Sequence, residues 1–378
     1  MEFIIAKDTL VDSLSAVEKF VPSKSSISLL MGIKFFCINN TLYLSATDLE
    51  MGIEQKISGE NLHIIKEGSA VIPAKVLSEI TKKLPSGSVE FSIKENRVNI
   101  TSGDFAMELP FYDALDFPEI SKKECVSRIK FSQATFKNLI KQTIFAKADD
   151  TTSRPQLTGI LIELKGKKFN MVALDGYRIA WCFEEIEETP KSEENMSIIV
   201  PGRTMSELAR IFSDEEDDEF AIYSGKNRVE FRTNDIVISS RILEGNFIDY
   251  EKVMCIQDKT RVNIEVDALL GAIERAYIMA REGNKNNLVK FFISKDTVEV
   301  SADTELGNIN DKLLCNTSGD ELLIAFNARF LIDALRTIES THVNLFFSGE
   351  TGPVIIKPVD KENQINFILP VKLRGDDF

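Results

Sequence analysis

Histidine, cysteine and tryptophan are scarce in this sequence. Its 378 residues include two histidines, five cysteines and one tryptophan. His63 and His342 lie in different parts of the chain, and neither is next to a nucleophile-type motif. A catalytic triad is therefore not indicated, because it needs a histidine held beside a serine or cysteine. The cysteines are odd in number and never spaced as Cys-x-x-Cys, so neither a disulfide framework nor a zinc site is predicted.

Long apolar segments are also absent. No run of 18 apolar residues occurs, and the apolar patch at the N-terminus is interrupted by Lys7 and Asp8. A membrane-spanning helix and a secretory signal peptide both need an unbroken apolar stretch, so neither is predicted. Together with the few cysteines, these absences lead us to expect a protein of the reducing cytoplasm.

The motifs of nucleotide-binding and metal-dependent enzymes are missing too. There is no GxxxxGK(S/T) loop, no GxGxxG fingerprint and no HExxH helix. The acidic run DEEDDE (214–219) lacks the glycine and the final glutamate of a calcium-binding loop. We therefore expect no cofactor, no metal site and no catalytic residue.

What the sequence contains instead is one pattern repeated three times. FIIAKDTLVDSLSAVEKF, RIKFSQATFKNLIKQTIFAK and RVNIEVDALLGAIERAYIMA each look like a short strand followed by an amphipathic helix. Leu10, Phe136 and Leu269 occupy matching places, 126 and 133 residues apart. A period of this length indicates duplicated whole domains, because solenoid repeats are much shorter.

Two further markers have the same period. Each copy contains a second strand end followed by a helix, as in VIPAKVLSEITKKL, and an aspartate after a short apolar run, as in SATD. Asp48, Asp175 and Asp303 are 127 and 128 residues apart. This recurrence favours a structural turn over a paired-carboxylate site at Asp48 and Glu50. We expect an α+β fold of three domains, each with two helices and many short antiparallel strands. The expected domains are residues 1–125, 126–254 and 255–378.

Charge is unevenly distributed along the chain. The net charge is −14, which by itself argues against binding to nucleic acid. The expected helices nevertheless carry more lysine and arginine than acid, whereas acid gathers in EEIEE (184–188) and DEEDDE (214–219). Lysine-rich helices are common on ordinary solvated surfaces, but their recurrence in three copies favours one basic surface built from helices. Such a surface can follow a phosphate backbone without reading bases.

The segment VALDGYRIA (172–180) predicts a β-hairpin, because an Asp-Gly pair lies between two short apolar runs. Tyr177, Arg178 and Ile179 follow the turn directly. By themselves, these would be ordinary residues of a solvent-facing hairpin.

As a whole, the sequence resembles a known family, the bacterial DNA polymerase III β subunits, which are sliding clamps. The resemblance covers essentially the whole chain and rests on segments that are specific when taken together: SATDLEMGI, DFPEI, VALDGYRIA, SSRILEGNFIDYEKV, AFNARFLIDAL and LPVKL. It implies a head-to-tail homodimeric ring of six similar domains, with helices lining the hole and antiparallel sheets outside. Enclosure then replaces tight phosphate binding, so a weak and salt-sensitive attraction to DNA suffices.

The resemblance also implies partners. A clamp encircles double-stranded DNA without regard to sequence and gives the polymerase processivity, but it is not itself catalytic. Its expected partners are a second copy of itself, the DNA polymerase III α subunit, the clamp loader, and other clamp-binding proteins such as repair polymerases, mismatch-repair proteins and ligase. We expect a cytoplasmic protein that associates with the nucleoid during replication.

In this family, a pocket beside the second-copy hairpin binds short linear motifs of the partners. Carried over position by position, its residues here are Leu157, Leu174, Gly176, Tyr177, Arg178, Ile179, Ile248, Lys252, Val253, Asn327, Phe330, Pro353, Phe367, Leu369, Pro370, Val371 and Lys372. The apolar members would hold leucine and aromatic anchors of a motif. Gly176 would let a backbone approach closely, and Arg178 and Lys252 at the rim would meet polar or acidic peptide groups.

Some positions depart from the family pattern. Tyr177 stands where histidine is common, Ile248 where proline is usual, and Phe330 where a tyrosine would bring a hydroxyl. The chain also continues beyond LPVKL as RGDDF (374–378). These departures keep the place of the pocket and leave its peptide preference open.

The resemblance also places contacts to DNA and to the second protomer. The basic positions expected to face DNA are Lys24, Lys75, Lys82, Lys137, Lys141, Arg154 and Arg203. The segment DFAMEL (104–109) of one protomer would pair with an edge strand of the third copy in the other. Met107 and Leu109 would then pack near Ile278 and Met279, and an otherwise exposed edge strand would be covered.

Two other functions stay open from the sequence. The hairpin with Asp175 would serve as the active site of an enzyme, which the scarcity of histidine disfavours. Alternatively, the chain would be a three-domain adaptor that never touches DNA.

Overall fold

The computed structural model describes residues 1–120, 127–186, 196–283 and 287–373. The expected boundary between the first two domains, at 125 and 126, and the extension at 374–378 lie outside these residues, and the acidic segment at 184–188 lies partly outside them. The chain divides into two compact units, which are described separately. Of the described residues, unit 1 holds 1–135 and 207–242, and unit 2 holds 136–186, 196–206 and 243–373.

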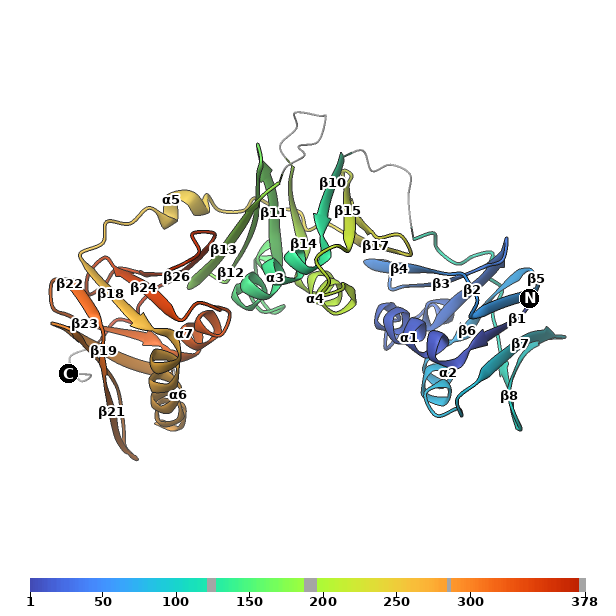
Figure 1. Ribbon diagram of the computed structural model, residues 1–378, viewed down its shortest axis with the longest axis horizontal. Helices are drawn as coiled ribbons and strands as arrows, with labels where there is room; N and C mark the ends of the chain where they lie inside the picture. The colour runs from blue at the N-terminus through green and yellow to red at the C-terminus, as the bar shows by residue number, and fades with distance from the viewer. Residues whose placement is uncertain (121–126, 187–195, 284–286, 374–378) are drawn as a thin grey trace. The chain divides into compact units, whose positions relative to one another are not determined.

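The first sequence copy lies entirely in unit 1 (Figure 1). Its elements are β1 (Glu2–Ala6), α1 (Lys7–Val17), η1 (Glu18–Phe20), η2 (Ser28–Met31), β2 (Gly32–Ile38), β3 (Thr41–Thr47), β4 (Met51–Ile57), β5 (Leu62–Lys66), β6 (Gly68–Pro73), α2 (Ala74–Thr81), β7 (Ser88–Lys94), β8 (Arg97–Ser102) and β9 (Phe105–Pro110). In Figure 1, α1 and α2 lie beside each other against these strands.

The second copy contributes to both units. Its elements are β10 (Ser127–Ser132), α3 (Gln133–Thr143), η3 (Ile144–Ala146), η4 (Pro155–Thr158), β11 (Gly159–Lys165), β12 (Lys168–Leu174), β13 (Arg178–Glu185), β14 (Ser197–Pro201), α4 (Gly202–Ile211), β15 (Glu219–Ser224), β16 (Arg228–Arg232) and β17 (Ile236–Arg241). Strands β10 and β15 to β17 belong to unit 1, and β11 to β14 belong to unit 2.

The third copy lies in unit 2. Its elements, with a short helix that precedes them, are α5 (Tyr250–Met254), β18 (Thr260–Glu265), α6 (Val266–Gly283), β19 (Leu288–Ser294), β20 (Thr297–Thr304), β21 (Gly307–Leu314), β22 (Asn316–Gly319), β23 (Leu322–Asn327), α7 (Ala328–Leu335), β24 (His342–Phe347), β25 (Val354–Pro358) and β26 (Gln364–Ile368).

The long helices form where apolar residues recur every three or four positions. In α1, Leu10, Leu14 and Val17 are buried and form one stripe, and in α7 Leu331 and Leu335 do the same. A strand precedes each helix, as the repeats predict. The expectation of two long helices in each copy is therefore confirmed.

The strands form four sheets with antiparallel neighbours. Unit 1 contains a sheet in the order β5-β1-β7-β8-β9 and another in the order β10-β15-β16-β17-β4-β3-β2-β6. Unit 2 contains a sheet in the order β14-β11-β12-β13-β26-β25-β24-β18-β22 and another in the order β21-β20-β19-β23. Phenylalanine side chains pack in the core of each unit. In unit 1 the rings of Phe3 and Phe91 stack with their centres 4.7 Å apart, and in unit 2 the rings of Phe291 and Phe326 pack edge to face with their centres 5.9 Å apart.

Two backbone ladders join consecutive copies. In unit 1, β17 of the second copy pairs with β4 of the first, and Ile238 lies opposite Ile53. In unit 2, β13 of the second copy pairs with β26 of the third, and Ile179 lies opposite Phe367. Each of these two pairs of copies thus shares a continuous sheet.

The helix α5 is not predicted from the repeats. Asp249 caps its start, because the Asp249 carboxylate accepts a hydrogen bond from the backbone N–H of Lys252 at 3.3 Å. Tyr250 and Met254 are buried beneath the helix. The segment therefore lies on the nine-stranded sheet as a short amphipathic helix.

Candidate functional site

The predicted hairpin is present, with a loop of Asp175, Gly176 and Tyr177 between β12 and β13. One carboxylate oxygen of Asp175 accepts the backbone N–H groups of Tyr177 at 2.9 Å and Arg178 at 3.1 Å. Gly176 has φ +97°, a conformation that favours glycine. These bonds fix the turn and hold Tyr177 outward, where it is 64% exposed.

A buried apolar cluster lies next to the hairpin in unit 2. Leu157, Leu174, Ile179 and Phe367 are each at most 6% exposed and pack in one cluster with buried residues of α5. The strand register places Leu174 opposite Ile179 and Ile179 opposite Phe367. Four of the carried-over pocket residues are thus brought together as an apolar floor.

Apolar side chains at the edge of this floor stay exposed. Ile248, Val253 and Leu369 are 41%, 39% and 38% exposed. The backbone N–H of Leu369 donates to the carbonyl of Tyr177 at 2.9 Å, and the Tyr177 ring stacks on Phe330 at 6.2 Å. Exposed apolar groups beside a buried floor are what a site for leucine and aromatic anchors requires.

The remaining carried-over residues surround this edge. Asn327 caps α7 by accepting the backbone N–H of Arg329 at 3.0 Å, and the backbone N–H of Val371 donates to Ala325 at 2.8 Å. Pro353 precedes β25, Pro370 follows Leu369, and Lys372 is exposed.

Lys252 has the exposure expected of a rim residue, 85% for its side chain. It forms an ion pair with Asp249 at 2.7 Å, and hydrogen bonding to Asp249 raises the pKa of Lys252. In turn, the hydrogen bonds from Lys252 lower the pKa of Asp249. The ammonium group is therefore charged, accessible and already linked to the cap of α5.

The expected rim role of Arg178 is wrong. Its side chain is 10% exposed, and its guanidinium bonds Asp175 at 2.9 Å, Asp333 at 2.7 Å and the carbonyl of Phe145 at 2.7 Å. The guanidinium carbon also lies 4.4 Å from the centre of the Phe330 ring. Successive residues of a strand face opposite sides, so Ile179 faces the apolar floor while Arg178 faces α7. Arg178 therefore holds the hairpin against α7 and is not a free cation for a peptide.

A polar cavity of about 420 Å³ continues inward from the hairpin. Its lining includes Tyr177, Arg178, Asn327 and Phe330, together with residues of the segment 147–152. The apolar floor, the exposed edge and this cavity together form a surface that can bind an extended peptide.

Comparison with known proteins decides the family. Models of the DNA polymerase III beta subunit match along the chain: the N-terminal domain at residues 1–121, the central domain at 130–249 and the C-terminal domain at 251–372. A beta sliding clamp of Staphylococcus epidermidis is 32% identical over 380 residues, which cover 98% of this chain and 99% of that protein. The chain belongs to the DNA polymerase III beta subunit family.

Other members of the DNA polymerase III beta subunit family also match this chain over nearly its whole length. A beta sliding clamp of Halalkalibacterium halodurans is 30% identical over 381 residues, covering 98% of this chain and 100% of that protein. The crystal structure of the DNA polymerase sliding clamp from Bacillus subtilis has a TM-score of 0.94 at 29% identity, covering 99% of this chain and 100% of that chain. A griselimycin-bound sliding clamp of Pseudomonas aeruginosa has a TM-score of 0.93 at 25% identity, covering the same shares. The expected α+β fold of three clamp domains is confirmed.

The basic residues that the family resemblance assigns to DNA are unequally available. Lys24, Lys75, Lys141 and Arg154 are exposed, whereas Lys137 is half-buried. Lys82 is exposed but forms an ion pair with Glu18 at 3.3 Å. Arg203 is exposed at the start of α4.

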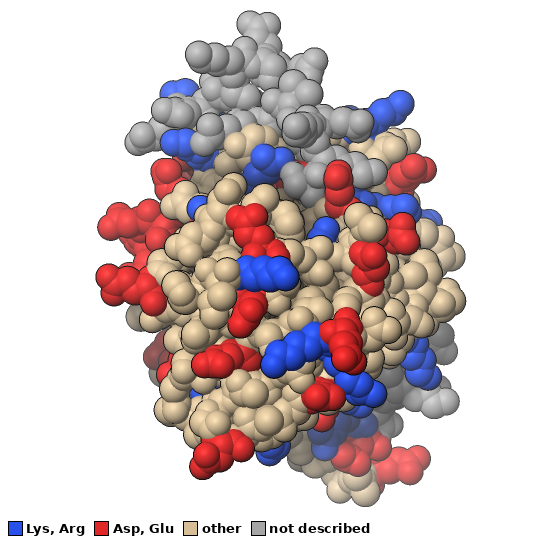
Figure 2. All heavy atoms as spheres, turned by 90° about the vertical axis from the view of Figure 1, so that its right-hand side faces the viewer, with Lys and Arg blue, Asp and Glu red and all other residues tan. Residues whose placement is uncertain are grey.

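Several other helix cations are neutralised by neighbouring acids. In unit 2, Arg336 at the C-cap of α7 pairs with Glu274 of α6 at 2.8 Å, and Arg275 pairs with Asp311 at 2.7 Å. Fewer cations of the helices are therefore left to attract DNA than the numbers of lysine and arginine suggest. Figure 2 shows acidic and basic side chains interspersed on the face toward the right of Figure 1, so the described residues of that face do not form a uniformly acidic surface.

The expected dimer strands lie at sheet edges. Strand β9, which carries Met107 and Leu109, is the last strand of its sheet, and β21 is the first strand of another. In β9, Met107 and Leu109 are half-buried on one face. Ile278 on α6 is 62% exposed, and Met279 packs partly against the core of unit 2.

The described ranges contain neither a metal-binding cluster nor a membrane-spanning helix. Within them, no group of three His, Cys, Asp or Glu side chains is placed to hold a metal ion. No helix there has both the length and the apolar character to cross a membrane.

The sequence does not reveal several residues that shape the site. Asp333 and Phe145 hold Arg178, and Tyr250 and Met254 complete the apolar cluster. The one available signal was Asp249, a helix-capping residue one position before Tyr250 in NFIDYEKV. Asp333 is 155 positions from Arg178, and no local pattern links residues at that distance.

Proposed function

We propose that this chain works as a DNA sliding clamp, a non-catalytic processivity factor that encircles duplex DNA and tethers a replicative polymerase. The observation that carries the proposal is the match of all three family domains, in order, over nearly the entire chain. The relatives named beta sliding clamp support it over the same length. We propose domain limits of 1–125, 126–254 and 255–378.

The proposed peptide site is the apolar floor with its exposed edge. Leucine and aromatic anchors of a partner motif would cover Ile248, Val253 and Leu369, which are open to solvent. Tyr177 would lie along the bound peptide. The partners proposed for it are the polymerase III α subunit, the clamp loader and repair proteins with similar motifs.

The proposed clamp closes through a second copy of the chain. Strand β9 of one protomer would extend the sheet that ends at β21 of the other, because an exposed edge offers unpaired backbone groups. Met107 and Leu109 would cover Ile278 and Met279. The exposed cations Lys24, Lys75, Lys141 and Arg154, with Lys82, Lys137 and Arg203, would supply a weak attraction to the phosphate backbone. Such a clamp would work in the cytoplasm, on nucleoid DNA.

Topological retention on DNA tests this function. The protein, loaded by its clamp loader, should remain on nicked circular duplex DNA during gel filtration and dissociate when the circle is linearised. An adaptor that never encloses DNA would elute separately from both forms. Equal retention on circular and linear DNA would mean ordinary phosphate binding and would contradict the clamp.

Peptide binding tests the proposed pocket separately. A peptide with leucine and phenylalanine anchors should bind the wild-type protein, and Tyr177→Ala with Leu369→Ala should weaken it about tenfold or more, as expected when interface anchors are truncated. Tyr112→Ala is the matched control, because Tyr112 is a 41% exposed tyrosine of unit 1. An unchanged affinity in the double variant would place the pocket elsewhere.

A further inference from the structure

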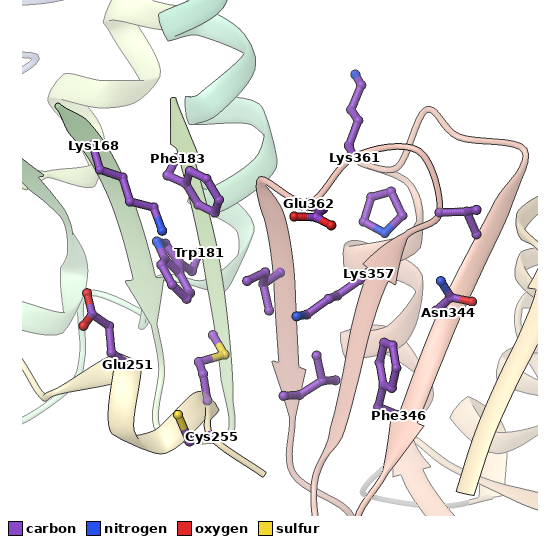
Figure 3. Close-up of a pocket in the computed structure, with 15 residues that line it drawn as sticks. Lys168, Trp181, Phe183, Glu251, Cys255, Asn344, Phe346, Lys357, Lys361 and Glu362 are labelled. Atoms are coloured by element: carbon purple, nitrogen blue, oxygen red, sulfur yellow. The ribbon is translucent and has the colours of Figure 1, made fainter. Parts of the chain in front are cut away.

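A second and larger cavity, of about 710 Å³, lies on the nine-stranded sheet beside α5 (Figure 3). We call it the lysine groove. Its lining includes Lys168, Trp181, Phe183, Phe346, Lys357 and Ile365. None of the carried-over pocket residues is among them, so the lysine groove is a separate site of the size that binds ligands.

The floor of the lysine groove is apolar and aromatic. Trp181 lies opposite Ile365 in the β13–β26 ladder, and Phe346 lies opposite Ile355 in the β24–β25 ladder. Trp181 and Phe183 have ring centres 5.6 Å apart and are both half-buried. Half-buried aromatic faces beside buried isoleucines offer a surface on which a planar or aliphatic side chain can pack.

Two lysines of the groove make no ion pair with a described residue. The Lys168 ammonium lies 3.5 Å from the centre of the Phe183 ring, and the Lys357 ammonium lies 5.9 Å from that of Phe346. In Figure 3 both point into the groove, from the β12 side and from the β25 side. Burial lowers the pKa of Lys168, and the nearby carboxylates of Glu251 and Glu185 offset that effect only in part.

The other charges around the groove are mostly compensated. Glu251 pairs with Lys165 at 3.0 Å, and Lys361 pairs with Glu339 at 3.2 Å and points away from the groove in Figure 3. Glu362 is the one lining acid for which no such pair is formed among the described residues. Among the lining residues, three lysines therefore stand against two glutamates, and Glu185 lies opposite Lys168 in the β12–β13 ladder.

The lysine groove is continuous with the proposed peptide pocket. Phe367 of the pocket floor lies opposite Ile355 of the groove floor in the β25–β26 ladder. Val253 and Met254 are successive residues of α5, and they belong to the pocket and to the groove respectively. A chain bound in the pocket can therefore continue around α5 into the groove.

We propose that the lysine groove binds an acidic segment, containing an aromatic residue, that flanks the clamp-binding motif of a partner protein. Two carboxylates of the segment would pair with Lys168 and Lys357, and its aromatic side chain would pack on Trp181 and Phe183. This inference rests on the proposed function, because it takes the neighbouring pocket as the motif site. Such a segment would extend the contact between the partner and the clamp beyond the motif. Partners with acidic residues beside their motif would therefore bind more tightly.

Two synthetic peptides test the inference with the full-length protein. The minimal peptide carries only the leucine and phenylalanine anchors, and the extended peptide adds a flank with two aspartates and one tryptophan, placed at each end in turn. One of the extended peptides should bind about tenfold more tightly, as expected for two exposed ion pairs and an aromatic contact. The gain should shrink as salt is raised from low ionic strength, because exposed charge pairs are screened.

Variants separate the groove from the pocket. Lys168→Ala with Lys357→Ala should abolish the gain and leave the minimal peptide unaffected, and Phe183→Ala should reduce the gain. Lys295→Ala is the matched control, because Lys295 is an exposed lysine in the turn between β19 and β20, outside the groove.

Cys255 gives an independent readout, because it lines the groove and is exposed, whereas Cys37 and Cys182 are buried. The extended peptide should slow alkylation of Cys255 more than the minimal peptide does.

Each contrary result has its own meaning. A minimal peptide that binds while neither flank adds affinity would overturn the lysine groove alone. If Tyr177→Ala does not change the affinity for the minimal peptide, the proposed pocket is wrong, and this inference is wrong with it. A gain that survives the lysine double variant, or that an extended peptide with two aspartates and no tryptophan reproduces in full, would also overturn the proposed occupant.

Discussion

At the scale of single residues, Arg178 connects three parts of unit 2. It bonds the hairpin through Asp175, the end of α3 and η3 through the carbonyl of Phe145, and α7 through Asp333. Two carboxylates and a carbonyl satisfy one planar guanidinium, a geometry that a lysine ammonium does not reproduce. The shape of the pocket edge therefore depends on a residue that a bound peptide need not touch.

Loss of Arg178 should destabilise the protein. Arg178→Ala leaves Asp175 and Asp333 unpaired in a poorly solvated place, which costs about 3 kcal/mol of unfolding free energy when a buried pair is broken. Denaturant unfolding measures the change. Arg336→Ala serves as the control, because Arg336 is 63% exposed and its pair with Glu274 should contribute less than about 1 kcal/mol. Equal effects of the two variants would contradict the structural role of Arg178.

The turn at Gly176 leads to a second residue-scale prediction. Gly176→Ala should cost about 1–2 kcal/mol of unfolding free energy, since φ +97° disfavours a side chain although no atom lies within 4 Å of the place that a Cβ would occupy. Gly59→Ala, at φ +105° and equally open, should lose similar stability. Peptide affinity should fall only in Gly176→Ala, and a parallel fall in Gly59→Ala would show a global effect instead.

Burial of single residues was the least predictable feature. A tyrosine and an arginine after a hairpin turn look alike in sequence, yet Tyr177 is 64% exposed and Arg178 is 9% exposed. The difference arises from the alternation of strand faces and from Asp333, which the chain brings near only by folding. The glycine of the turn was predictable, because the required backbone conformation is local.

At the scale of secondary structure, α5 separates the two proposed binding regions. It is only five residues long, too short to be stable alone. Its stability comes from the buried Tyr250 and Met254 and from the Asp249 cap. Tyr250 also donates a hydrogen bond from its hydroxyl to Glu163 at 2.7 Å, which anchors the helix to β11.

Removal of the cap should loosen α5. Asp249→Ala should speed hydrogen exchange at the amides of residues 252 and 253 roughly fivefold, since the hydrogen bond of the N-cap is lost. The wild-type cap should persist through neutral pH. Hydrogen bonds from Lys252 lower the pKa of Asp249 below its ordinary value of 3.8, so its stabilisation is lost only as the pH falls through that lowered pKa.

A matched variant separates the cap from charge alone. Asp258→Ala removes a half-buried acid that pairs with Arg261 but does not cap a helix. Exchange in α5 should be unchanged in that variant. If both variants accelerate exchange equally, the cap is not what holds α5.

The long elements were predictable where their signals are local. Periodic apolar residues placed α1 and α7. Of the three repeated aspartates, Asp48 and Asp175 lie in turns, whereas Asp303 lies within β20. The pairing of β4 with β17 and of β13 with β26 was not predictable, because the partners are more than a hundred residues apart. The groove beside α5 was missed for the same reason, since Lys168 and Lys357 approach it from strands of different copies.

At the scale of the whole molecule, assembly depends on edge strands. Strands β9 and β21 each present one unpaired side, and the exposed Ile278 lies on α6. A strand edge covered in a dimer is protected from non-specific association. The proposed homodimer explains these features together.

A charge at Ile278 should dissociate the dimer. Ile278→Asp would place a carboxylate in an apolar contact, which costs several kcal/mol when it is left unpaired. Sedimentation at micromolar concentration should show a dimer for the wild-type protein and a monomer for the variant. Ile65→Asp is the control, because Ile65 is 54% exposed on β5, the strand at the opposite edge of the sheet from β9. A monomeric wild-type protein, or a dimeric Ile278→Asp variant, would contradict the proposed contact.

The ladders that join consecutive copies have a mechanical consequence. Pulling two neighbouring copies apart means shearing a row of backbone bonds, such as those of Ile236–Ser240 against Met51–Gln55. At the proposed interface between two protomers, by contrast, the paired strands are not also connected through one covalent chain. If the assembled dimer has to open to admit DNA, the interface between protomers should separate while the backbone ladders within each chain stay intact.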